Sequence, residues 1–153
     1  MRVLEPWVES PLATFLSESA ARLTLIMTRA GQVVAQHGFT RAFDVMSAAA
    51  LGAGIISSTE EMARVMGINQ FRTLSHQSRD QGVFLAGFDT PAGRWIGLVV
   101  FDRDSSLGLV QVFFDRMVRE LARAAPADGP REEILDQDFE NELHSSLRAL
   151  FGR

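Results

Sequence analysis

Hydrophobic positions follow two different spacings in the first part of the chain. Residues 12–19 carry apolar side chains three and four positions apart, which predicts a short helix capped by Ser10, a serine followed by proline. The spacing then changes to two, which predicts a half-buried strand over residues 23–28. Gly31 supplies a tight turn, and residues 33–37 are expected to return as the second strand of a hairpin.

The longest run with helical spacing covers residues 43–67. Its large apolar residues fall on one side of a helical wheel, and this side is predicted to face the protein core. They are Leu51, Ile55, Met62 and Met66. The opposite side carries Ala49, Ala53, Ser57, Glu60 and Arg64. Gly67 is predicted to end the helix as a left-handed cap residue.

Three more strands are predicted over residues 71–78, 83–88 and 95–101, separated by turn residues at positions 80–82 and 90–93. Residues 95–101 are apolar on both faces, which is typical of a central strand.

A helix capped by Ser105 or Ser106 follows the last predicted strand. Its apolar positions recur at helical spacing and are Val110, Phe113, Phe114, Met117, Val118 and Leu121. The order of elements is thus α-β-β-α-β-β-β-α. This order predicts one α+β domain over residues 1–124.

The composition changes after this domain. Residues 125–131 are rich in Ala, Pro, Asp and Gly, which indicates a linker. Residues 132–153 form an acidic segment whose apolar residues lie on one face of a predicted amphipathic helix: Leu135, Phe139, Leu143, Leu147, Leu150 and Phe151. This tail helix either folds back on its own domain or docks in a groove of a partner.

Composition narrows the classes of function. The chain has 153 residues and no cysteine, which excludes disulfides, thiolate nucleophiles and cysteine-ligated zinc. Its net charge of −4 argues against binding of nucleic acid. The sequence offers neither a long apolar run nor a signal peptide, so we expect a cytoplasmic protein that is not held in a membrane.

The residues give little support for an enzyme. His37, His76 and His144 fall on three different predicted elements and match no metal or triad spacing. Gly52 and Gly54 lie within a helix, where they cannot cradle a phosphate. Glu60 and Glu61 are adjacent, so their side chains diverge. We therefore expect no catalytic residues, no metal and no cofactor.

Four stretches of sequence indicate a family. They are residues 51–54 (Leu-Gly-Ala-Gly), 62–67 (Met-Ala-Arg-Val-Met-Gly), 75–78 (Ser-His-Gln-Ser) and 101–110 (Phe-Asp-Arg-Asp-Ser-Ser-Leu-Gly-Leu-Val). Over residues 12–124 the chain resembles the Roadblock (dynein light chain) family, and within it the bacterial MglB proteins. The resemblance implies an α+β fold of the sandwich type, in which a five-stranded antiparallel sheet carries the long helix on one face. The resemblance implies a homodimer that binds a Ras-like small GTPase of the MglA type in its GTP state, in cell polarity or motility. It also implies that the tail helix reaches the GTPase through Phe139, Leu143, Leu147 and Phe151.

The resemblance assigns two sets of interface residues. The set expected to face the GTPase is Ala53, Ser57, Glu60, Glu61 and Arg64. The set expected at the dimer interface is Ala49, Gly52, Ile56, Phe71, Thr73, Leu74 and His76, with the edge strands of two copies joined in one ten-stranded sheet. The small residues Ala49, Ala53 and Ser57 could instead serve ordinary helix packing within one chain. Glu60 and Glu61 depart from the family, which often has small residues there, and this departure bears on the identity of the partner.

Three arginines on the predicted surface are candidates for an arginine finger. Arg64, Arg79 and Arg103 are assigned to the rim, because the resemblance implies that the GTPase supplies its own catalytic Arg and Gln. The alternative function is a structural scaffold that recruits another protein through the long helix or the tail. A small-molecule sensor is a third interpretation. The consecutive apolar residues 99–101 give it little support, because they are expected to fill the space that a ligand would need.

Overall fold

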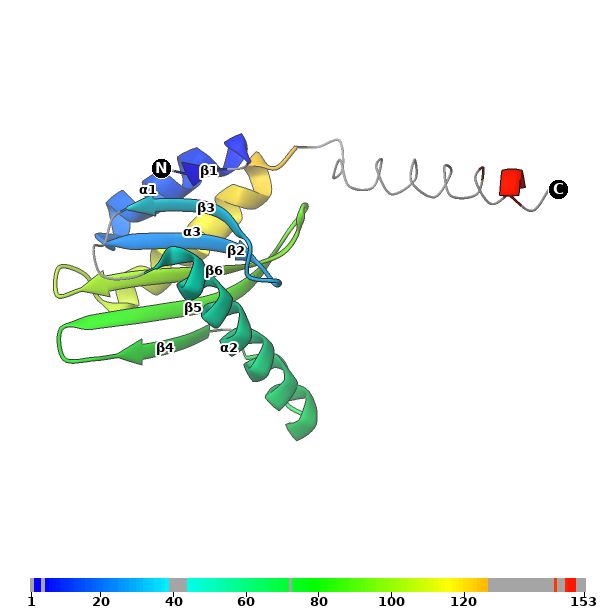
Figure 1. Ribbon diagram of the computed structural model, residues 1–153. Helices are drawn as coiled ribbons and strands as arrows, with labels where there is room; N and C mark the ends of the chain where they lie inside the picture. Colours follow the sequence, from blue (N-terminus) through cyan, green and yellow to red (C-terminus); the bar gives the residue numbers. More distant parts are fainter. Residues whose placement is uncertain are drawn as a thin grey trace.

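The computed structural model describes residues 2–3, 5–38, 44–71, 73–126, 145 and 148–150. They form an α+β fold around one antiparallel sheet in the order β1-β3-β2-β6-β5-β4 (Figure 1). The strands are β1 (Arg2–Val3), β2 (Leu23–Thr28), β3 (Val33–Gly38), β4 (Thr73–Gln77), β5 (Gln81–Thr90) and β6 (Gly93–Asp102). The five predicted strands are confirmed, and the two-residue β1 is an addition that pairs with β3.

Helices cover both faces of the sheet (Figure 1). They are η1 (Pro6–Val8), α1 (Glu9–Ser19), α2 (Val45–Met66) and α3 (Leu107–Ala124). Helices α1 and α3 pack together on one face, and α2 lies on the other. The predicted cap at Ser10 is wrong: the chain is already turning at Pro6, so α1 starts at Glu9 and includes Ser10.

Glycines with positive φ lie at the turns of the β2–β3 and β5–β6 hairpins. Gly31 has a φ of +84° and its N–H donates to Thr28 O at 2.9 Å, which closes the predicted β2–β3 turn. Gly93 has a φ of +124° in the β5–β6 turn, opposite Thr90. The second hairpin places β6 between β5 and β2, so the predicted central strand is confirmed.

The core between the sheet and the α1–α3 layer is aromatic. Phe114 of α3 lies edge-on to Phe84 and Phe88 of β5 and to Phe15 of α1. Gly97 of β6 makes room for it, since a Cβ at this position would lie 2.5 Å from the Phe114 ring. Contacts of this kind fix the position of α3 over β5 and β6.

The predicted orientation of the long helix is wrong. Leu51, Ile55, Met62 and Met66 point to solvent, whereas the side against the sheet is built from Ala49, Gly52, Ala53, Ile56 and Ala63. Small residues let the helix backbone approach a crowded sheet. A Cβ on Gly52 would lie 3.2 Å from a Leu98 methyl and 3.3 Å from a Leu85 methyl. The alternative of ordinary packing within one chain is therefore the correct one for Ala49 and Ala53.

The predicted linker and tail fall mostly outside the described residues, as do the anchors Phe139, Leu143, Leu147 and Phe151. Ser145 and the residues 148–150 are helical and exposed. None of the helices that the structure describes combines the length and apolar character needed to cross a bilayer.

Candidate protein-binding surface

Helix α2 is held firmly at both ends. At its start, the Asp44 carboxylate accepts from the Met46 N–H at 3.0 Å and from the Ser47 hydroxyl at 2.8 Å. These two hydrogen bonds hold the pKa of the Asp44 carboxyl below its usual value, and the bond from the Ser47 hydroxyl has the larger effect. At its end, Gly67 has a φ of +67° and the Ile68 N–H donates to Ala63 O at 2.9 Å. A 22-residue helix with both caps made is a stable platform.

Six large apolar side chains are exposed on this platform. They are Met46, Leu51, Ile55, Met62, Val65 and Met66, and the five that share one face of the helix, all but Met46, are what we name the α2 patch. Leu51 is 69% exposed and Met62 is 55% exposed. An isolated soluble chain rarely displays so many neighbouring apolar side chains, and such patches mark contacts with other macromolecules. Four of these residues stood out in the sequence but were predicted to lie in the core, and Met46 and Val65 were not predicted at all.

Small residues lie beside the α2 patch. Ala50, Gly54 and Ser58 follow one another at intervals of four and are all exposed. A Cβ on Gly54 would meet nothing within 4 Å in the chain itself. The segment from Val45 to Thr59 contains no charged residue. This half of the exposed helix face therefore offers another backbone close approach without the cost of burying a charge.

The sheet has an open edge next to this helix. Strand β4 pairs with β5 on one side, and no described strand lies on its other side. At the opposite edge, β1 covers part of β3. Leu74 and His76 lie opposite Leu85 and Val83, so they point to the α2 side. An uncovered strand edge and an apolar helix face thus occur together.

The structure separates the residues that the resemblance assigned to the dimer interface. Ala49, Gly52 and Ile56 are buried on the face of α2 that packs against the chain's own sheet, so they cannot contact a partner directly. The others lie along the open edge or just before it: Phe71, Thr73, Leu74 and His76. Leu74 is half-buried and the rest are exposed.

The residues assigned to the GTPase also separate. Ala53 is 4% exposed and faces the sheet, which corrects its assignment. Ser57, Glu61 and Arg64 are exposed. The Arg64 Nε donates to Glu61 Oε2 at 3.0 Å one turn away, and this bond lowers the pKa of the Glu61 carboxyl and raises that of the guanidinium.

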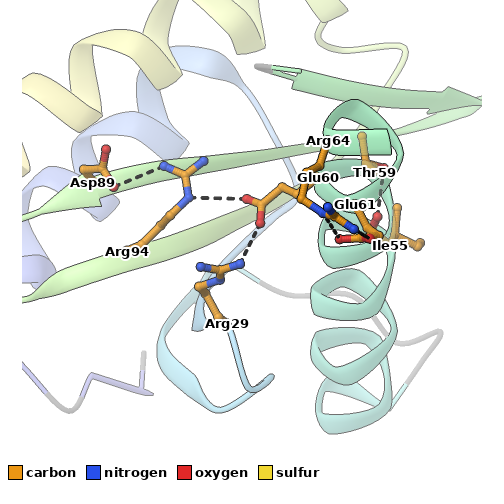
Figure 2. Close-up of polar contacts among 8 residues, drawn as sticks. All are labelled: Arg29, Ile55, Thr59, Glu60, Glu61, Arg64, Asp89 and Arg94. Atoms are coloured by element: carbon orange, nitrogen blue, oxygen red, sulfur yellow. Dashed lines mark hydrogen bonds and ion pairs between the residues drawn. The ribbon is translucent and has the colours of Figure 1, made fainter. Parts of the chain in front are cut away.

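Glu60 is engaged within the chain (Figure 2). Its carboxylate accepts from Arg29 at 2.7 Å and lies 3.4 Å from the Arg94 Nε. Arg94 also donates to Asp89 at 3.1 Å. Figure 2 shows Glu60 reaching away from α2 toward these two arginines. The cluster ties the C-terminal half of α2 to the β2–β3 hairpin and to β6. No sequence pattern indicated either arginine, because both are distant from Glu60 in the chain.

Other candidate groups do not converge. His37 lies on β3 and His76 on β4, which are separated by three strands of the sheet, while His144 lies outside the described residues. The buried Thr24 Oγ1 and His37 Nδ1 have no hydrogen-bond partner in the part of the chain that the structure describes. Within the same residues no group of three or more His, Asp or Glu side chains could hold a metal ion. Arg103 pairs with Asp80 near the β4–β5 turn.

Solved structures with the same fold were found. The gliding protein MglB from Thermus thermophilus is 27% identical, with a TM-score of 0.67, and the match covers 80% of this chain and 94% of that chain. Myxococcus xanthus MglB is 22% identical, with a TM-score of 0.70, covering 78% of this chain and 95% of that one. A Roadblock/LC7 domain from Streptomyces avermitilis is 14% identical, with a TM-score of 0.60 and coverages of 71% and 89%.

Neither a protein-family model nor a curated protein matches the sequence significantly. The match to the solved structures extends over nearly their whole length. The fold they share with this chain is the one that the sequence motifs predicted. The chain is therefore a Roadblock-like protein close to MglB.

Proposed function

We propose that this chain is a homodimeric regulator of a Ras-like small GTPase. The observation that carries the proposal is the α2 patch beside the open β4 edge, which together give one surface that is incomplete in a single copy. The GTPase as partner follows from the resemblance to MglB proteins. The chain contributes no catalytic group in this account.

The two copies are expected to join across a twofold axis. Pairing of β4 with the β4 of a second copy satisfies the open edge and extends the sheet to both copies. The α2 helices then pack side by side, with Leu51, Ile55 and Met62 at the contact and Gly54 where the backbones come closest. Burial of these side chains supplies the main driving force, at roughly 25 cal/mol per Å² of apolar surface.

The paired helices would select the GTP-bound conformation of the GTPase. Binding one conformation in preference to another shifts its population, with a coupling free energy of about 1 to 3 kcal/mol. Ordering of the GTPase's own Arg and Gln would then accelerate hydrolysis by positioning alone. The exposed polar residues available for contact are Ser57, Glu61 and Arg64, whereas Glu60 is already engaged by Arg29 and Arg94.

The tail would strengthen the complex by tethering. A second contact through Phe139, Leu143, Leu147 and Phe151 raises the effective concentration of one partner near the other. Leu150, a large apolar residue of this segment, is 78% exposed in the single chain, which leaves it available to a partner.

The test is GTP hydrolysis by a Ras-like GTPase from the same genome. We expect the chain to raise phosphate release by about tenfold or more, as positioning effects allow. The variant Leu51→Glu with Met62→Glu should abolish the stimulation by separating the dimer. Glu61→Arg should weaken it in the intact dimer. Glu9→Arg, an exposed reversal on α1, is the matched control and should change nothing. Absence of both stimulation and a GTP-dependent complex would refute the proposal.

A scaffold is the second candidate function, favoured by the exposed Leu150. In that case the chain binds its partner through the tail without changing hydrolysis. Binding would then survive Glu61→Arg and would be lost when Phe139 and Phe151 are replaced by serine. A GTPase platform on α2 predicts the opposite ranking of the two variants.

A further inference from the structure

A groove of about 460 Å³ opens beside β5, on the side of the sheet that α3 covers. It lies between Asp89 at the end of β5, Gln111 and Asp115 of α3, and Phe71 before β4. Phe114 and Val118 form its apolar wall. We name it the edge groove. No residue of α2 lines the edge groove, so it is separate from the α2 patch, although Phe71 and Thr73 at its border also lie along the open edge of the sheet.

The edge groove exists because β4 is shorter than β5. The five residues of β4 pair with Gly82 to Ala86, whereas β5 continues along β6 as far as Thr90. In the same register, Phe71 and Gln70 would lie opposite Phe88 and Asp89, yet they do not pair with them. The chain leaves the sheet here, and Phe71 is left 41% exposed at the edge of the groove.

The backbone of β5 is free to pair at this point. A β-turn joins the C=O of its first residue to the N–H of its fourth, so Thr90 directs its backbone groups toward Gly93 of β6. Alternate residues of an antiparallel strand point to opposite neighbours. Asp89 therefore directs its N–H and C=O away from β6 and into the edge groove. An extended segment of another chain could add to β5 there, as peptides add to exposed sheet edges.

The charges around the edge groove select the segment. Asp89 projects toward the α2 side of the sheet, where its side chain is 82% exposed despite the contact with Arg94. Asp115 is exposed on the α3 side. The described ion pairs of α3 join Arg116 to Glu18 and Glu120, and Asp115 takes part in none of them. Successive side chains of an added strand point to opposite faces of the sheet. Of two adjacent cationic residues, one would therefore meet Asp89 on the α2 side and the other would meet Asp115 on the α3 side.

The chain's own tail is a poor occupant. Seven of the 19 acidic residues and three of the 15 arginines lie in residues 127–153, which leaves twelve of each in the rest of the chain. The whole net charge of −4 therefore resides in the tail. Bringing it between Asp89 and Asp115 would place like charges together, which is unfavourable.

We propose that the edge groove binds an extended, arginine- or lysine-containing segment of a partner protein, which adds as a strand to β5 between Asp89 and Asp115. The partner's apolar side chains would pack against Phe71 and Val118. The protein would then carry a second docking site at the β5 edge of the sheet, outside the α2 patch, able to connect a partner to the GTPase-binding dimer.

The experiment titrates the full chain with the heptapeptide Val-Arg-Arg-Val-Arg-Arg-Val and, in parallel, with Val-Glu-Glu-Val-Glu-Glu-Val. Amide chemical shifts locate the site and peptide anisotropy gives the affinity. We expect the arginine peptide to bind and the glutamate peptide not to bind. Binding should change the amide chemical shifts of residues 87–90 and 111–118. Asp115→Arg and Asp89→Asn should each weaken binding, the reversal by about tenfold.

The acidic tail is the competing site for a cationic peptide, so the control is Glu132→Arg with Glu133→Arg. These changes should leave both the affinity and the shifts at the edge groove unaltered. Binding that depends on Glu132 and Glu133 and not on Asp115 would overturn the proposal. Absence of binding at millimolar peptide, or equal binding of the glutamate peptide, would also overturn it. So would concentration-dependent shifts at residues 111–118 without peptide, because they would mean that a second copy fills the groove.

Discussion

The Arg29 guanidinium lies 2.7 Å from the Glu60 carboxylate and joins the β2–β3 hairpin to the C-terminal half of α2. Glu60 is thereby drawn toward the sheet and away from the exposed face of the helix (Figure 2). Glu60 was expected from the family resemblance to face a GTPase, but its ion pairs give it a structural role within the chain. Its neighbour Glu61 is exposed.

The first prediction concerns this cluster. Glu60→Gln removes both ion pairs and should lower the free energy of unfolding by about 1 kcal/mol, because partly exposed pairs contribute a few tenths to 1 kcal/mol each. Urea unfolding at one fixed protein concentration measures it. Glu61→Gln, which loses one exposed pair with Arg64, is the control and should cost less than Glu60→Gln, because solvent screens an exposed pair. An equal or larger cost at Glu61 would disprove the structural role of Glu60.

The second prediction compares two glycines of α2. Gly52→Val should destabilise the folded chain by roughly 1 to 3 kcal/mol, because its side chain would overlap the Leu98 and Leu85 methyls. Gly54→Val meets no atom of its own chain and should leave the stability of a single copy unchanged or slightly raised. It should nevertheless weaken self-association by about tenfold. Unfolding and sedimentation equilibrium separate the two effects, and a destabilising Gly54→Val with intact association would contradict the account.

The third prediction concerns acid stability. The Asp104 N–H and the Arg22 guanidinium hold the pKa of Asp102 below its usual value. A carboxyl whose pKa is lower in the folded state stabilises the fold above its unfolded pKa of about 3.9, and this stabilisation is lost as the pH falls through the folded value. Asp102→Asn should therefore reduce stability at neutral pH and flatten its decline below about pH 4. Unfolding curves recorded between neutral pH and pH 2 measure this difference. If the free energy of unfolding fell equally steeply with pH in the native chain and in the variant, the result would count against the Arg22–Asp102 contact.

The fourth prediction concerns the tail. Phe139→Ser with Phe151→Ser should weaken binding of the GTP-loaded GTPase through loss of the tethered contact, without changing the mass of the free dimer. Calorimetric titration and light scattering measure these two quantities. Unchanged affinity would mean that the tail serves another partner or its own domain.

Much of the fold was predictable because local sequence signals agree with it. The alternation over residues 23–28, the turn at Gly31 and the apolar residues of β6 each specify a neighbourhood that the tertiary structure keeps. The caps at Gly67 and Ser106 were also predicted, since each satisfies backbone groups within one turn of its own helix.

The orientation of α2 was not predictable from its periodicity alone. A helical wheel identifies an apolar stripe but does not say whether the chain itself or a partner covers it. Here steric fit decided: the sheet beneath α2 leaves room for Gly52 and Ala53 and not for residues such as Leu51. In the Glu60 cluster, Arg29 lies 31 positions and Arg94 lies 34 positions from Glu60 in the sequence, and no local pattern encodes contacts over such separations.

The mass of the protein in solution tests the central claim most directly, namely that a second copy covers the α2 patch. Light scattering at micromolar concentration should give twice the chain mass of 16.9 kDa for the native sequence, and 16.9 kDa for Leu51→Glu with Met62→Glu. A folded native chain that stays at 16.9 kDa across the micromolar range would contradict it.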